Sequence, residues 1–153
     1  MLYHSKRKFL LQASAIAFIS YFSFSSKLFA SWPKNLFHSK DAEKLINLLT
    51  EGEKYTESDK ISIKAPEIAE NGAVVPVSVN ADIEGVKNIA ILVDNNPSPL
   101  TSTFDINPQL EAYVSTRVKM AESSNIVAVV STKDNQFYVA SRSIKVTIGG
   151  CGG

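Results

Sequence analysis

The hydrophobic pattern of the chain changes from helical to alternating near residue 53. Between Ser39 and Gly52, apolar residues recur at the three- and four-residue spacing of one helix face. These apolar residues are Ala42, Leu45, Ile46, Leu48 and Leu49. Serine is a common helix cap and glycine a common helix terminator, so the pattern predicts one short helix that Ser39 caps and Gly52 ends.

Seven strand-like runs follow this helix, separated by turn-forming pairs such as Asn71–Gly72 and Asn107–Pro108. The runs are 59–65, 74–81, 86–94, 101–106, 113–121, 126–132 and 137–148. Most of them alternate between apolar and polar residues, whereas 86–94 is almost continuously apolar, which is typical of a strand covered on both faces. The pattern therefore predicts a mainly β fold, an immunoglobulin-like antiparallel β-sandwich with a short N-terminal helix.

Residues 1–30 have the pattern of an export signal peptide. The basic residues Lys6, Arg7 and Lys8 precede an uncharged run that continues to Ser26. The basic pair Lys6–Arg7 resembles a twin-arginine signal, except that lysine stands first. We expect cleavage after Ala30, which would release a mature protein into the periplasm. An uncleaved membrane anchor is the alternative, but serines dilute the run, which is also short for a membrane span.

Charge and cysteine content narrow the possible functions. The net charge is +1, yet four of the 16 basic residues and none of the 15 acidic ones lie in residues 1–30. The rest of the chain therefore carries 12 basic and 15 acidic residues, a net charge of −3 without a basic stripe, which argues against nucleic-acid binding. A single cysteine excludes an internal disulfide, a cysteine-based zinc site and an iron–sulfur cluster. We expect no metal and no cofactor.

That single cysteine, Cys151, lies in the C-terminal sequence GGCGG. Its neighbours are Gly149, Gly150, Gly152 and Gly153. Glycine packs no side chain and has the widest choice of backbone angles, so this stretch adds nothing to a core and predicts a narrow, flexible arm. Three extended residues beyond Ile148 would place Cys151 up to about 10 Å from the last strand.

The sequence gives Cys151 no catalytic surroundings of its own. Catalytic thiols are activated by a nearby cation, a helix N-terminus or a paired base. The nearest cation in the sequence is Lys145, and after signal cleavage the one remaining histidine would be His38, far from the thiol. We therefore expect a protein that is not an enzyme and that presents its thiol to the active sites of other proteins.

Four stretches together resemble the SoxY family, the sulfur-carrier subunits of the bacterial thiosulfate-oxidising (Sox) system. They are PEIAENGAVVPVSV at 66–79, IAILVDNNPSPL at 89–100, YVSTRVKMAESSNIVAVV at 113–130 and the terminal GGCGG. The resemblance implies a SoxY-type sandwich domain over 31–148, after the signal at 1–30, and a cysteine-bearing arm at 149–153.

The resemblance also implies a set of partners. SoxZ would be the permanent partner in a heterodimer, and Cys151 would carry the substrate covalently. The cytochrome SoxXA would join thiosulfate to the thiol, and the hydrolase SoxB would release sulfate. Where it is present, the dehydrogenase SoxCD would oxidise the sulfur left on the carrier.

Two other functions remain as alternatives. One is an exported interaction module that crosslinks through Cys151. The other is a ubiquitin-like carrier that activates its C-terminal carboxylate after Gly152–Gly153. Carriers of the second kind are cytosolic β-grasp domains with a helix packed inside the sheet, whereas here the predicted helix precedes all strands and follows an export signal.

Overall fold

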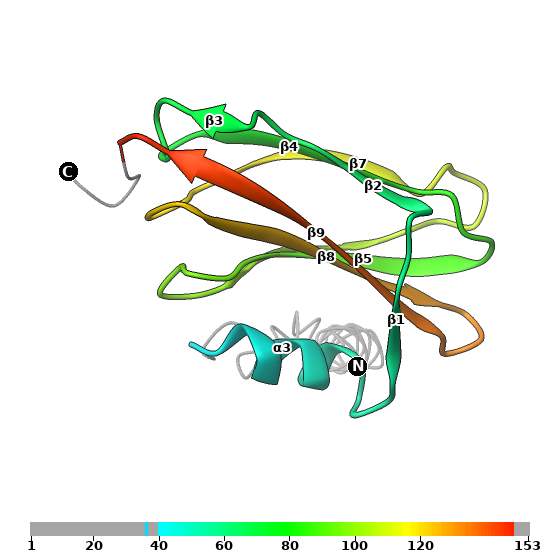
Figure 1. Ribbon diagram of the computed structural model, residues 1–153. Helices are drawn as coiled ribbons and strands as arrows, with labels where there is room; N and C mark the ends of the chain where they lie inside the picture. The colour runs from blue at the N-terminus through cyan, green and yellow to red at the C-terminus, as the bar shows by residue number, and fades with distance from the viewer. Residues whose placement is uncertain (1–35, 37–39, 149–153) are drawn as a thin grey trace, which may run out of the picture. The chain divides into compact units, whose positions relative to one another are not determined.

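The computed structural model describes residue 36 and residues 40–148 (Figure 1). The predicted export signal at 1–30 and the predicted arm at 149–153 lie outside the described residues. The described elements are α3 (Ala42–Leu49), β1 (Tyr55–Glu57), β2 (Ile61–Lys64), β3 (Ile68–Ala69), β4 (Val75–Ala81), β5 (Val86–Val93), β6 (Leu100–Asp105), β7 (Tyr113–Val118), β8 (Ser124–Thr132) and β9 (Phe137–Val146). No helix in this part of the chain is long and apolar enough to cross a membrane.

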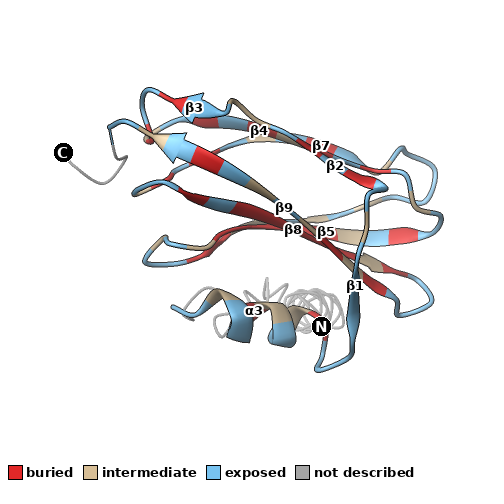
Figure 2. Cartoon of the chain, viewed as in Figure 1, coloured by how far each residue is buried: buried red, intermediate tan, exposed pale blue. Residues whose placement is uncertain are grey.

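The strands form two sheets that pack face to face (Figure 1). The larger sheet has the order β1-β9-β8-β5-β6, with β3 also paired to β9, and the smaller sheet has the order β2-β4-β7. Buried residues, red in Figure 2, lie along the strands of both sheets. The predicted two-layered, mainly β fold with the helix ahead of the strands is confirmed.

Strand β5 explains why one run of the sequence is continuously apolar. Ile89, Ile91 and Val93 belong to the core between the two sheets. Ala90 and Leu92 point to the opposite side and pack with residues of α3. Because both faces of β5 are covered, polar residues at alternate positions would be buried, and Ile89–Val93 is apolar throughout.

The helix is capped differently from the prediction. Asp41, not Ser39, is the N-cap residue, and its carboxylate accepts a hydrogen bond of 3.1 Å from the backbone N–H of Lys44. At the other end, Glu51 and Gly52 both have positive φ, and the Gly52 N–H donates to the carbonyl of Asn47 over 2.8 Å. Gly52 therefore does help to terminate the helix, as predicted, although Glu51 is the first residue to leave it in the left-handed conformation.

The helix face is narrower than its apolar residues suggest. Leu45 is fully buried against the larger sheet, and Ile46 and Leu49 are partly buried beside it. Leu48 is 41% exposed, so its predicted place on the buried face is wrong. Leu48 lies beside the contact stripe that Leu45, Ile46 and Leu49 form, rather than on it.

Two short strands, β1 and β3, were missed, and both run parallel to β9. The predicted antiparallel sandwich therefore also has two short parallel pairs at this edge. The three residues of β1 are all exposed, and β3 has only two residues, so neither leaves an alternating pattern in the sequence. Only their pairing with β9 makes them strands.

Candidate functional site

Cys151 and the four arm glycines lie outside the described residues, so the site is built from the strand end that carries them. Hydrogen bonds hold this end of the chain up to Ile148. The Thr147 N–H donates to the carbonyl of Ala69 over 3.0 Å, and the Thr147 hydroxyl donates to the carbonyl of Glu70 over 2.9 Å. The carbonyl of Ile148 accepts from the Gly72 N–H over 2.7 Å. The last described residue before the arm is thus tied to the segment that links β3 to β4.

A second segment holds the end of β9 from its other side. The Ser123 hydroxyl accepts a 2.9 Å hydrogen bond from the backbone N–H of Val146. The Met120 N–H donates over 2.7 Å to the carbonyl of Gly72, which links this segment to the first one. Residues 119–123 therefore belong to the same hydrogen-bonded base as the end of β9.

Two asparagines join a third loop to this base. The Asn96 amide donates to the carbonyl of Lys119 over 2.7 Å and accepts from the N–H of Ala121 over 2.9 Å. The backbone N–H of Asn95 donates to the Ser124 hydroxyl over 2.9 Å. We call residues 70–74, 94–99 and 119–123 the arm-end loops, because all three lie at the end of the sandwich where β9 leads into 149–153 (Figure 1).

Sequence reasoning found Cys151 but missed this base. The signal was present in the Asn-Asn-Pro sequence at 95–97, which interrupts the strand pattern. Asparagine favours turns because its side chain can bond to nearby backbone. In this case the side-chain partners are distant in the sequence, which no local pattern reveals.

Exposed apolar side chains accompany the arm-end loops. Ile148 is 67% exposed, Ile68 on β3 is 59% exposed and Val74 just before β4 is 55% exposed. We call these three residues the apolar rim. Ile68 and Val74 flank the segment whose backbone is hydrogen-bonded to Thr147 and Ile148, so all three residues lie near the base of the arm along the chain. Exposed apolar groups gathered at one place are typical of surfaces that meet other proteins.

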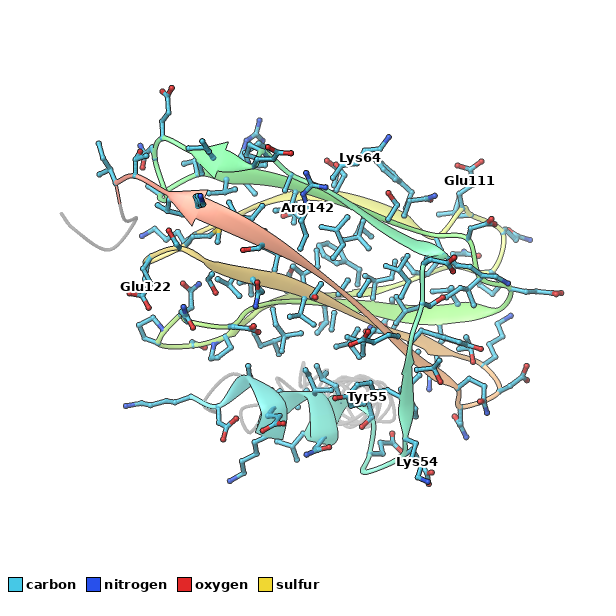
Figure 3. The ribbon with its side chains drawn as sticks, viewed as in Figure 1. Lys54, Tyr55, Lys64, Glu111, Glu122 and Arg142 are labelled. Carbon is cyan, nitrogen blue, oxygen red and sulfur yellow. The ribbon has the colours of Figure 1, made fainter. Side chains whose placement is uncertain are left out.

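No group of three His, Cys, Asp or Glu side chains in the described part could hold a metal ion. A hollow of about 780 Å³ lies at the opposite end, lined by the loops 82–85, 106–112 and 133–134. The labelled side chains of Glu122 and Glu111 mark these two ends in Figure 3. The hollow therefore lies at the opposite end of the sandwich from Ile148, the last described residue before the arm.

A separate polar group of residues lies on the outer face of the β2-β4-β7 sheet. The strand register places Lys64, Ser78 and Ser115 in one row across the three strands. Tyr113 lies in the next row, and its hydroxyl donates to the Ser78 hydroxyl over 3.3 Å, while Ser78 donates to Ser115 over 3.0 Å. These hydroxyls, together with the positive charge of Lys64, lower the pKa of Tyr113. The hydrogen bond with Ser78 is the largest cause. It lowers the pKa because a seryl hydroxyl can rotate and donate to the phenolate, which stabilises the charged form.

This arrangement predicts the titration of Tyr113. We expect it to ionise at a lower pH than an ordinary tyrosine, and we expect the Ser78→Ala substitution to move its pKa back upwards. Because the folded-state pKa is lowered, the associated stabilisation is present at high pH and is lost as the pH falls through that pKa. Ultraviolet difference titration of the parent, Ser78→Ala and Tyr113→Phe proteins would measure the pKa of Tyr113. Identical titration curves for parent and Ser78→Ala would contradict the assignment.

The chain matches known proteins over most of the described part. The profile of the family described as sulfur oxidation protein SoxY matches residues 46–151, a range that includes Cys151. No curated protein matches the sequence. Among solved structures, the sulfur carrier protein SoxY from Chlorobium limicola f thiosulfatophilum is 44% identical, with a TM-score of 0.62. The match covers 69% of this chain and 96% of that one.

Other solved structures share the fold at much lower identity. The superoxide reductase (neelaredoxin) from Ignicoccus hospitalis is 17% identical, with a TM-score of 0.52, over 57% of this chain and 80% of that one. A putative superoxide reductase from Thermotoga maritima is 19% identical, with a TM-score of 0.50, over 61% and 87%. These likenesses concern the sandwich alone, whereas the profile match and the 44% identity concern the sequence as well. This chain belongs to the SoxY family of sulfur oxidation proteins.

Proposed function

We propose that this chain is the sulfur-compound carrier of a thiosulfate-oxidising system, and that Cys151 holds the substrate covalently. The observation that carries the proposal is the position of the chain's only thiol, three residues beyond a strand end that is hydrogen-bonded up to Ile148. Membership of the SoxY family supports a carrier role in sulfur oxidation. The attachment of sulfur at Cys151 is our proposal.

The chemistry begins with an oxidative coupling. The Cys151 thiolate and the sulfane sulfur of thiosulfate form a sulfur–sulfur bond, and two electrons pass to an external acceptor, for which we propose the cytochrome SoxXA. The product is Cys–S–S–SO₃⁻. Hydrolysis by SoxB adds water to the terminal sulfonate, releases sulfate and two protons, and leaves the persulfide Cys–S–S⁻. This chain supplies the sulfur atom to which the substrate is attached, and its partners supply the catalytic groups.

A complete cycle needs a further oxidation. The outer persulfide sulfur takes up three oxygen atoms from water and releases six electrons and six protons, for which SoxCD is the proposed catalyst. A second hydrolysis by SoxB then releases sulfate and regenerates the Cys151 thiolate. Without SoxCD the carrier would stop at the persulfide.

The arm-end geometry limits how an enzyme can reach the thiol. Three residues separate Ile148 from Cys151, so the attachment point lies within about 10 Å of Ile148. An enzyme whose reactive group is recessed by a comparable depth must bring its surface against the base of the arm. The apolar rim of Ile68, Val74 and Ile148 would then be covered in each complex, which accounts for three large apolar side chains in water.

We further propose that the protein works in the periplasm as a heterodimer with SoxZ. The export-signal pattern of residues 1–30 supports the location. Residues 31–148 would form the carrier domain and residues 149–153 the arm. After cleavage of the signal, no membrane attachment is expected.

The experiment that tests the proposal is the intact mass of the protein purified from cells grown with thiosulfate. We expect added masses of sulfane sulfur and sulfonate on the intact protein, and peptide masses should locate them on the peptide that contains Cys151. A thiol reductant should remove them. Protein from cells grown without reduced sulfur is the matched control. Disulfide-linked dimers without any sulfur adduct would instead favour a crosslinking module.

A further inference from the structure

A serine side chain holds the end of β9 on the side of β8. The backbone pairing of these two strands ends where Ile144 lies opposite Ser124, so Val146 lies beyond it. The Ser123 hydroxyl takes the place of a backbone partner there. It accepts from the Val146 N–H over 2.9 Å and donates to the Val146 carbonyl over 3.4 Å. One exposed side chain therefore extends the hold on β9 beyond its last backbone pair with β8.

The segment that follows β3 holds the same strand end from the other side (Figure 1). The Ala69 carbonyl accepts from the Thr147 N–H over 3.0 Å, and the Glu70 carbonyl accepts from the Thr147 hydroxyl over 2.9 Å. The Gly72 N–H donates to the Ile148 carbonyl over 2.7 Å. The backbone of residues 146–148 is therefore bonded on both of its sides.

We call Ser123 and Thr147 the arm clamp, because their hydroxyl groups complete this hold. Both side chains are exposed, and neither belongs to a hydrophobic core, so the packing of the domain does not depend on them. Exposed hydrogen bonds add little to the stability of a whole domain, because water competes for the same groups. The clamp should therefore act mainly on the segment that it holds, residues 146–148.

The clamp determines how far the thiol can travel from the domain. With Ile148 held, three residues lead to Cys151, which is about 10 Å of extended chain. If the chain came free after Lys145, six residues would lead to Cys151, and the reach would be about 20 Å. The effective concentration of a tethered group falls roughly as the −3/2 power of tether length, so a doubled tether dilutes the thiol about threefold at a partner's active site.

We propose that Ser123 and Thr147 are positioning residues for the carrier reaction. Their hydroxyl groups fix the start of the arm at Ile148, and they thereby set the reach and the effective concentration of Cys151 at an enzyme's active site. Neither residue touches the reacting sulfur, and both act through the backbone of residues 146–148. This inference rests on the proposed carrier function.

The test compares two arm lengths, each with the clamp intact or released. The released variant is Ser123→Ala with Thr147→Val, which removes both hydroxyl groups. The matched control is Ser123→Thr with Thr147→Ser, which keeps both. The parent and the released variant are also made with Gly149 deleted, which shortens the arm by about 3.5 Å. The measured quantity is kcat/KM for the carrier in thiosulfate-dependent cytochrome reduction by purified SoxXA.

We expect release of the clamp to have opposite effects in the two arms. In the full-length arm, release should lower kcat/KM by up to about threefold, and the control should behave like the parent. Deleting Gly149 should lower kcat/KM strongly, because the thiol then falls short of the reactive group. In the shortened arm, release should raise kcat/KM, since residues 146–148 can supply the missing length. A loss of stability would lower the rate in both arms and cannot produce this reversal.

Two further measurements examine the clamp and the thiol directly. Hydrogen exchange at the amides of Gly72 and Thr147 should be on the order of tenfold faster in the released variant, because two side-chain hydrogen bonds no longer oppose opening. Alkylation of Cys151 by a small reagent should proceed at one rate in every variant. Unchanged amide exchange, or an alkylation rate that follows the clamp, would overturn the inference.

Three kinetic results would also overturn it. They are equal kcat/KM for the parent and the released variant, full turnover of the shortened parent, and a further loss when the shortened arm is released. Intact mass after exposure to thiosulfate and SoxXA separates these failures from failure of the proposed function. A parent that gains no sulfur adduct contradicts the carrier function and the inference that rests on it. Normal loading of the parent without the reversal contradicts the clamp alone.

Discussion

Replacing Cys151 with serine is expected to abolish thiosulfate-dependent turnover in a reconstituted Sox system and to leave the melting temperature unchanged. A serine hydroxyl cannot form the sulfur–sulfur bond on which the proposed cycle begins, and the chain has no second thiol to replace it. The fold should persist, because the described cores consist of residues between 36 and 146. Electron transfer to the cytochrome and sulfate release are the two rates to measure.

The outcomes of this substitution separate two errors. Appreciable turnover by the Cys151→Ser protein would refute the covalent carrier. A large fall in its melting temperature would show instead that residues 149–153 pack against the domain. Cys151→Ala is the matched control, since it also removes the sulfur but introduces no hydroxyl.

Replacing Gly150 with valine should lower turnover strongly while alkylation of the thiol by a small reagent continues at the parent rate. Valine is β-branched, which widens the arm and restricts its backbone angles, and both changes oppose entry into a narrow channel. A small reagent in water needs no channel, so its rate should not depend on the width of the arm. Both rates would be measured on the same preparations.

The Gly150→Ala protein is the control for this prediction. One methyl group adds little width, so its turnover should lie between those of the parent and the valine variant. Parent-like turnover of Gly150→Val would mean that the glycines have no role in access. If alkylation slowed in step with turnover, Cys151 would be held in a local site rather than presented by an open arm.

The sequence was informative where one rule of local physics dominates. Alternation of apolar and polar residues located the long strands, since a strand with one wet face must bury every second side chain. The same logic located β5 as the strand covered on both faces, and the structure places α3 and the smaller sheet on its two sides. The sequence also identified the candidate attachment residue, because Cys151 is the only cysteine of the chain and lies in a glycine-rich terminus.

Features that depend on partners distant in the sequence were not evident. β1 and β3 are strands only because β9 offers them backbone partners, and such short segments carry no periodic signal. Serine and aspartate are both good helix caps, so the residue type alone does not choose between Ser39 and Asp41. The choice of Asp41 depends on where the packed helix begins. Leu48 is as apolar as a core residue, yet it lies beside the stripe of α3 that contacts the sheet, and 41% of it is exposed.

The sequence by itself determined the fold class, the single thiol and the family resemblance, because these follow from residue periodicity and from motifs that are contiguous in the chain. The tertiary structure decided what holds the strand end before the arm and which distant residues share a sheet face. Asn96 and Ser123 support the base of the arm through bonds to segments more than 20 residues away. Lys64 and Arg117 likewise come from strands on either side of β4 and share the outer face of the smaller sheet only after the sheet has formed.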